Sequence, residues 1–261
     1  MLISHSLKTI FIKTRKTAGS SFERYIYENH FDPDHDILTG SKIDGTPWVN
    51  IPSHVRGHMD WEQIRNLIKV NGHDWWDTYT KVTIERNPWD KVVSQFWFFR
   101  KQLQKPDAMI GASAWEAFNY GFIHGAVLDK NFPNIDEAKE DLQMSTFEFE
   151  GFKGGFEDPD NPFKDENMPK DWHRYSDQNG PVVDRMIKYE TLADDFDAFL
   201  KTKGESLDIE KWLSINCKSG FREDDHYSEM YHPANIKIIG EYFHEEVENL
   251  GYVYESKVHN R

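Results

Sequence analysis

Short apolar runs followed by helical patterns recur three times along the chain. These strand-then-helix units cover residues 8–29, 80–103 and 182–204. In the second unit Val82 and Ile84 alternate with polar residues, and the helix that follows carries apolar side chains at core-like spacing. Strands that alternate with helices predict a parallel sheet with helices packed on it. The expected fold class is therefore α/β.

Residues that start and end helices refine these units. Pro88 follows the second strand and suits the first position of a helix. Thr191 is predicted to cap the helix of the third unit. A last helix is expected over residues 233–250, ending at Gly251, with residues 252–254 as a short terminal strand.

Two irregular stretches, residues 31–60 and 104–178, separate the units and are rich in turn residues. Loops that follow parallel strands usually form the binding crevice of an α/β protein. With 261 residues and a hydrophobic content of 38%, the chain can bury one sizeable core. We expect a single domain with insertions.

Net charge, cysteine content and hydropathy restrict the kinds of ligand and the cellular compartment that we expect for this chain. A formal net charge of -14 argues against broad binding to nucleic acid or to an anionic membrane, so an anionic ligand needs a local basic pocket. Cys217 is the only cysteine, which excludes an intramolecular disulfide framework and favours a reducing cytoplasm. No segment approaches the roughly 20 apolar residues of a spanning helix, and no signal peptide is evident. A soluble cytoplasmic protein is expected.

The first unit carries the candidate chemistry in the turn of TIFIKTRKTAGSSFERYIYE, residues 9–28. A strand that enters a helix through small and hydroxyl residues presents main-chain N–H groups at the positive end of the helix dipole, which suits phosphate or sulfate. Lys16 would add a positive charge, and Gly19 would let the main chain approach the anion closely. The alternative is an ordinary helix start with Ser20 or Ser21 as N-cap, and local pattern favours the two equally.

This turn is not the magnesium-dependent nucleotide loop G-x-x-x-x-G-K-[ST]. Ile10 and Arg15 stand where that pattern needs glycines before Lys16 and Thr17. The sequence therefore predicts an anion loop without the metal machinery, and no metal ligands are expected.

Three further residues could complete a site. Arg86 directly follows the second strand, and Ser94 lies about two helical turns later, so both could bind a second anion. A structural ion pair and a polar helix face are the common alternative. His58, beside Gly57, could accept a proton near neutral pH. The chain has 12 histidines, and His5, His54 and His73 compete for that role.

Together these motifs resemble the sulfotransferases that use 3′-phosphoadenosine 5′-phosphosulfate (PAPS), most closely the branch of the carbohydrate 2-O-sulfotransferases. FIKTRKTAGSSF takes the place of the family's 5′-phosphosulfate loop, and Gly57-His58 the place of its catalytic base. The family's 3′-phosphate element corresponds to Arg86, Asn87, Pro88 and Ser94. The segments VVDRMIKYETLADDF and NCKSGFREDDHYSEMYH resemble later parts of the family.

The resemblance implies a P-loop-like three-layer fold with helices on both faces of a central parallel sheet, plus helical and loop insertions. It implies transfer of a sulfuryl group from PAPS to a hydroxyl acceptor, with a carbohydrate as first candidate, by in-line attack and without a metal. His58 would be the general base and Lys16 would stabilise charge on the bridging oxygen. The residues implied to bind the 5′-phosphate are Lys16, Thr17, Ala18, Gly19, Ser20 and Ser21. Those implied to bind the 3′-phosphate are Arg86, Ser94, Lys218 and Arg222.

Two departures from the family pattern stand out. Arg15 replaces the proline usual before the lysine, and residues 101–170 match no part of the family. We expect one sulfotransferase domain over residues 1–261, with residues 101–178 as an acceptor-binding insertion. Two alternatives stay open: a nucleotide-dependent kinase, and a catalytically inactive relative that binds sugar or nucleotide.

Overall fold

The computed structural model describes most of the chain, as two compact units. Unit 1 comprises Met1–Arg86 and Lys170–Ser219, and unit 2 comprises Asn87–Pro169 and Gly220–Arg261. The expected single domain with an insertion at 101–178 stays a prediction. The described residues are 1–40, 47–51, 57–102, 114–116, 118–119, 123, 168–215, 222 and 226–256, with the main chain alone at 100–102 and 116.

Unit 1 is built on a five-stranded sheet with strand order β3-β1-β2-β4-β7. The strands are β1 (Leu2–Ser4), β2 (Thr9–Ile12), β3 (Ile37–Leu38), β4 (Thr80–Glu85) and β7 (Arg185–Lys188). β4 pairs in parallel with both β2 and β7, whereas β1 runs antiparallel to both of its neighbours. Four strands therefore share one direction. The α/β class is confirmed, but the sheet is mixed because the unpredicted strand β1 is reversed.

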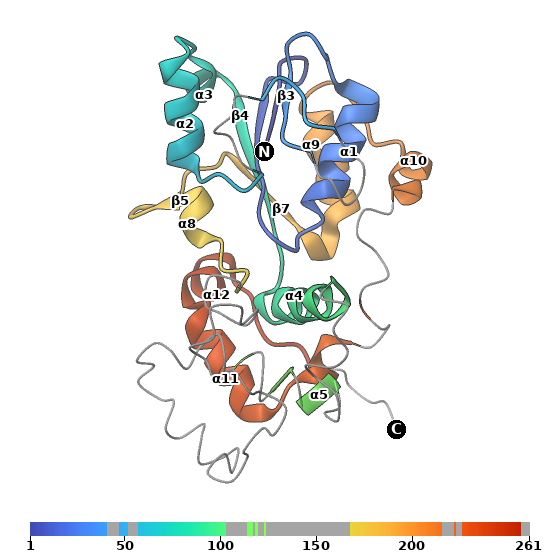
Figure 1. Cartoon of the computed structure of the whole chain (residues 1–261), viewed down its shortest axis with the longest axis vertical. Coiled ribbons are helices and arrows are strands. Elements are labelled where there is room, and N and C mark those ends of the chain that lie inside the picture. Colours follow the sequence, from blue (N-terminus) through green and yellow to red (C-terminus); the bar gives the residue numbers. More distant parts are fainter. Residues whose placement is uncertain are drawn as a thin grey trace. The chain divides into compact units, whose positions relative to one another are not determined.

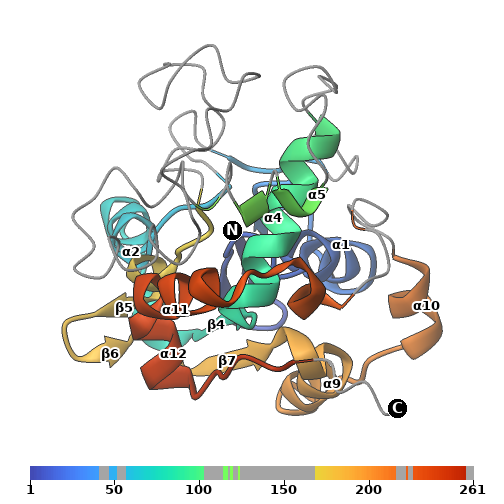
Figure 2. The same cartoon turned by 90° about the horizontal axis from the view of Figure 1, so that it is seen from below.

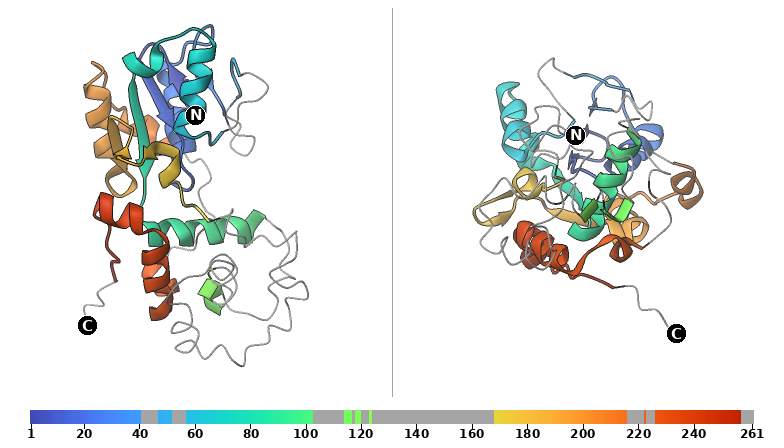
Figure 3. Two further views of the ribbon diagram at one scale, coloured as in Figure 1. Left: turned by 90° about the vertical axis from the view of Figure 1, so that its left-hand side faces the viewer. Right: turned by 60° about the horizontal axis from the view of Figure 1, so that its bottom comes forward.

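Helices cover both faces of this sheet (Figures 1 and 3). On one side lie α1 (Gly19–His30), α9 (Leu192–Lys201) and α10 (Ile209–Ser214). On the other lie α2 (Trp61–Val70), α3 (Trp75–Thr78) and α8 (Trp172–Tyr175). The unit is completed by the hairpin of β5 (Ser176–Asp177) and β6 (Gly180–Pro181), and by the short 3-10 helix η5 (Tyr189–Thr191).

Aromatic side chains fill the core between the sheet and α1 and α9. Phe22 of α1 is fully buried, with its ring centre 4.4 Å from that of Phe11 and 4.5 Å from that of Phe196. Val82 and Ile84 of β4 belong to the same cluster. These two alternating apolar residues thus face this core, as the sequence pattern predicts, because successive strand residues point to opposite faces.

Unit 2 is helical in its described part. Its elements are α4 (Pro88–Gln102), α5 (Ala114–Glu116), the 3-10 helix η6 (Tyr227–Met230), α11 (Pro233–Tyr242) and α12 (His244–Leu250). α4 contacts both α11 and η6 (Figure 2). Trp89 connects them, since its indole N–H donates to the carbonyl of Ile236 at 2.8 Å and its carbonyl accepts from the Tyr231 hydroxyl at 2.9 Å. Pro88 opens α4 as the sequence predicts.

Three local predictions are wrong. The last helix is divided at Phe243, a fully buried residue whose main chain leaves helical geometry between α11 and α12. Residues 252–254 form no strand. Thr191 occupies the N-cap position of α9, but its side chain makes no capping hydrogen bond. Its hydroxyl donates to the Asp195 carboxylate at 2.9 Å, and Asp195 also accepts the main-chain N–H of Lys188.

Among the helices of the described residues, none combines the length and the apolar character needed to cross a membrane.

The aromatic cluster under α1 should dominate the stability of unit 1. Replacing Phe22 by Ala leaves a cavity between two rings, and we expect a loss of about 3–5 kcal/mol in the free energy of unfolding, measured by urea denaturation. Val70→Ala is the control, because Val70 is 85% exposed and its loss should change stability by no more than ~0.5 kcal/mol. Equal effects of the two substitutions would contradict this account of the core.

Candidate functional site

The loop between β2 and α1 has an unusual main chain. Lys16 and Ala18 both have φ of 60°, while Thr17 between them is not among the residues with positive φ. A left-handed conformation costs a non-glycine residue roughly 1–2 kcal/mol, so two of them in one loop indicate a functional constraint. Where right- and left-handed residues alternate, successive N–H groups turn toward one side and can bind an anion, so this loop is a candidate anion site.

The start of α1 excludes the ordinary helix cap. Ala18 occupies the N-cap position and α1 has no side-chain cap hydrogen bond. Ser20 and Ser21 lie inside the first turn, so the alternative in which one of them is the N-cap is wrong. Gly19 is closely packed, since a Cβ there would lie 3.1 Å from Cγ of Lys13 and the lysine side chain would have to shift.

Hydroxyl groups hold this loop to the neighbouring strand. The Thr14 hydroxyl donates to the carbonyl of Ile84, and the Thr17 hydroxyl lies 2.8 Å from that of Thr14. Because the Thr14 proton is already used, Thr17 is the donor in this contact. Thr17 is fully buried. Its hydroxyl therefore holds the loop together, and a role toward an anion stays a prediction for its main-chain N–H alone.

A buried charge cluster lies beside the loop. Nζ of Lys13 pairs with Glu23 of α1, and the Met1 amino group donates to the same carboxylate at 2.8 Å. Burial by itself raises the pKa of Glu23, but the charges of Lys13 and of the Met1 amino group outweigh it and hold that pKa below its ordinary value. Sequence analysis missed Lys13 and Glu23, because nothing in a local pattern marks a lysine as buried.

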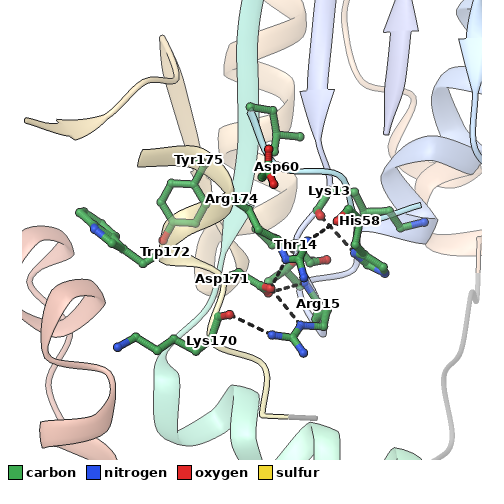
Figure 4. Close-up of polar contacts among 12 residues, drawn as sticks. Lys13, Thr14, Arg15, His58, Asp60, Lys170, Asp171, Trp172, Arg174 and Tyr175 are labelled. Atoms are coloured by element: carbon green, nitrogen blue, oxygen red, sulfur yellow. Dashed lines mark hydrogen bonds and ion pairs between the residues drawn. The ribbon is translucent and has the colours of Figure 1, made fainter. Parts of the chain in front are cut away.

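His58 is anchored to the same loop. Its Nδ1 lies 3.1 Å from the carbonyl oxygen of Lys13, as drawn in Figure 4. A carbonyl can only accept, so Nδ1 donates and Nε2 keeps its lone pair. Burial, followed by the charges of Lys13 and the Met1 amino group, lowers the pKa of His58 to about 4. The ring is therefore neutral at pH 7 and Nε2 carries a lone pair, but the lowered pKa makes His58 a weaker base than the histidine expected to titrate near neutral pH.

Arg86 joins the site from the end of β4. Its Nη1 donates to the carbonyl of Lys16 at 3.1 Å, and its guanidinium lies 3.9 Å from the ring centre of Tyr189, just beyond β7. The residues that follow β2, β4 and β7 thus meet at one edge of the sheet, as expected for parallel strands.

The remaining predicted residues belong to unit 2 or lie outside the described residues. Ser94 is on α4 in unit 2, and Arg222 of the same unit pairs with Asp90, one turn before Ser94 on that helix. Lys218 lies outside the described residues. The structure therefore brings Lys16 and the loop together with His58 and Arg86, whereas the predicted convergence with Ser94, Arg222 and Lys218 stays a prediction.

The competing histidines have structural contacts of their own. Nδ1 of His5 lies 2.7 Å from the Tyr79 hydroxyl, and His73 stacks on Trp75 with ring centres 3.7 Å apart. His54 lies outside the described residues.

Sequence analysis also missed Asp171 and Arg174, which fall within the predicted insertion but belong to unit 1. Asp171 is fully buried and accepts from the main-chain N–H of Arg15 at 2.6 Å, from Nε of Arg15 at 2.9 Å and from Nε of Arg174 at 2.7 Å. Arg174 in turn donates to the carbonyl of His58. A weak signal existed, since Asp171, Arg174 and Tyr175 have the spacing of one helical face.

Comparison of the chain with models of protein families, with curated proteins and with solved structures found no match. Within the part of the chain that is described, no group of three or more His, Cys, Asp or Glu side chains is arranged to bind a metal ion. Any function of this site is therefore inferred from the geometry of its residues.

The protonation of His58 provides a direct test of this geometry. In ¹⁵N-histidine NMR spectra, His58 should titrate near pH 4 with its proton on Nδ1. Since the folded pKa lies below the unfolded value of about 6.5, the contribution of His58 to stability is complete above pH 6.5 and declines as the pH falls toward 4. His35 is the control, because its hydrogen bond to Asp32 raises its pKa. Ordinary titration of His58 near 6.5 would contradict the buried, anchored ring.

Proposed function

We propose that the chain is a sulfotransferase of P-loop-like fold that moves a sulfuryl group from PAPS to a hydroxyl acceptor. One observation carries the proposal: the ring of the proton acceptor is hydrogen-bonded to the main chain at the start of the anion loop. The His58 ring is anchored on the carbonyl of Lys13, three residues before the left-handed Lys16. A base attached to an anion cradle suits transfer of a charged group to a hydroxyl.

The charges around the loop support an anionic ligand. The chain as a whole is acidic, yet cations outnumber carboxylates among the residues that the contacts of the loop and its neighbours join. The cations are Lys13, Arg15, Lys16, Arg86 and Arg174, and the carboxylates are Glu23, Glu85 and Asp171. With the uncapped start of α1, this excess fits the 5′-phosphosulfate group.

Each residue then has a definite role. His58 takes the acceptor's proton at Nε2 as the acceptor oxygen forms its bond to sulfur. Lys16 offsets the negative charge that develops on the bridging oxygen as the sulfur–oxygen bond to the 5′-phosphate breaks and that oxygen keeps the electron pair. The main-chain N–H groups of the loop hold the phosphate. Adenosine 3′,5′-bisphosphate is the product that leaves.

The roles of Lys16 and His58 should separate in kinetics. His58→Ala removes the base, so kcat should fall by about 10²–10⁴-fold while affinity for adenosine 3′,5′-bisphosphate persists. Lys16→Ala should lower both turnover and affinity. Turnover is measured with ³⁵S-labelled donor and a panel of hydroxyl acceptors, and affinity by calorimetry.

Exposed residues of unit 1 supply matched controls for both substitutions. Lys69→Ala and His35→Ala should leave turnover and affinity unchanged, because both side chains are exposed. Equal loss of nucleotide affinity in the His58 and Lys16 variants would reject the division of roles. Loss of wild-type activity in excess chelator would favour the kinase, and nucleotide binding without turnover on any acceptor would favour an inactive relative.

Arg86 has two possible roles that calorimetry can distinguish. If Arg86 binds the 3′-phosphate, Arg86→Ala should weaken the binding of adenosine 3′,5′-bisphosphate by about 1.5–3 kcal/mol. The binding of adenosine 5′-phosphate should be nearly unaffected. Equal weakening of both ligands would instead assign Arg86 to support of the loop through the Lys16 carbonyl.

A further inference from the structure

A closed circuit of polar contacts links the anion loop to His58 (Figure 4). It runs from the main-chain N–H of Arg15 to Asp171, from Asp171 to Nε of Arg174, and from Nη1 of Arg174 to the carbonyl of His58. The His58 ring then returns to the carbonyl of Lys13, two residues before Arg15. His58 is thus held at its main chain and at its ring by two chemically different contacts.

One turn of helix supplies the two residues that connect the loop to His58. Asp171 precedes α8 and does not cap it, because its carboxylate is committed to the two arginines. From the same face Tyr175 donates to Glu85 at the end of β4, at 2.9 Å. Residues spaced i, i+3 and i+4 therefore attach α8 to the loop, to His58 and to the sheet.

The circuit is buried and electrostatically strong. Asp171 is inaccessible to solvent, while the side chains of Arg15 and Arg174 are each 18% exposed. A buried carboxylate that bonds two guanidinium groups fixes both in place, because charged hydrogen bonds are short and directional. Nε2 of His58 has no hydrogen-bond partner in the described part of the chain, so the circuit orients the ring and leaves its basic nitrogen for substrate.

We infer that Asp171 and Arg174 are positioning residues for the transfer reaction: Arg174 fixes His58, and Asp171 fixes Arg174 together with the anion loop. This inference rests on the proposed function of the same site. It gives Arg15 a physical role, since the main chain and the side chain of Arg15 are both bound to Asp171. Arg15 attaches the loop to α8.

Four substitutions should give three different patterns. Arg174→Ala leaves Asp171 paired with Arg15, so the fold should persist and kcat should fall by about 10²-fold, the cost of a misplaced base, with unchanged affinity for adenosine 3′,5′-bisphosphate. Arg15→Ala frees the loop and should mainly weaken that affinity. Asp171→Asn should do both. Arg174→Lys should not rescue kcat, because an ammonium group cannot bond Asp171 and His58 as a fork.

Arg185→Ala is the matched control, since Arg185 is an exposed arginine of unit 1. Urea denaturation of each variant checks that it is folded. NMR of the His58 ring supplies a readout independent of activity: in Arg174→Ala the ring should lose its fixed Nδ1–H form and its pKa should rise from about 4 as water reaches it.

The two proposals can fail separately. If wild-type protein neither binds adenosine 3′,5′-bisphosphate nor transfers sulfate, the proposed function is overturned while the NMR comparison still tests the circuit. If folded Arg174→Ala keeps the His58 tautomer and pKa of the wild type, or if it loses nucleotide affinity as strongly as Arg15→Ala does, the positioning inference is overturned. Altered His58 titration together with a selective loss of kcat would establish it.

Discussion

The parallel pairing of β2 with β4 is the constraint on which the candidate site depends. Its register places Phe11 opposite Val82 and Ile12 opposite Thr83, and the Thr83 hydroxyl donates to the carbonyl of Ile12 at 2.8 Å. A slip of one residue would turn the apolar side chains of a strand to the opposite face, so the aromatic core also enforces this register. Both strands therefore end at one edge, where the loop after β2 meets Arg86.

Burial of charge gives that edge its chemical character. Glu23 binds Lys13 and the Met1 amino group, and Asp171 binds Arg15 and Arg174. Burial lowers the pKa of the Met1 amino group to about 6, so near pH 7 the Glu23 cluster is close to neutral. The Asp171 cluster, with two arginines, keeps a positive excess. Charges that are fixed in place in a poorly solvated region act on an anion more strongly than mobile charges in water do.

The sequence reveals those parts of the molecule that depend on local pattern. Strand-then-helix units, the helix start at Pro88 and the turn from β2 into α1 all follow from residues close together in the chain. The reversed strand β1, the Lys13–Glu23 pair and the circuit through Asp171 do not, because each needs a tertiary contact to exist. Asp171 meets Arg15 across 156 residues, and a buried aspartate has the same local signature as an exposed one.

The same limit explains the local errors. Thr191 has the sequence features of an N-cap, yet Asp195 binds its hydroxyl instead. The helix over 233–250 is predicted as one element, yet its main chain leaves helical geometry at the fully buried Phe243. Local pattern marks neither the partner of Thr191 nor the position of this break.

Asp195 has a consequence beyond the helix that it belongs to. β7 is the last strand of the described five-stranded sheet, and a terminal strand offers unpaired main-chain groups to the strands of other molecules. The Asp195 carboxylate occupies one such donor, the N–H of Lys188 at 3.0 Å, and the exposed side chains of Arg185 and Lys188 place charge along the same strand. This edge of the sheet is therefore protected against intermolecular strand addition, the first step of β-aggregation.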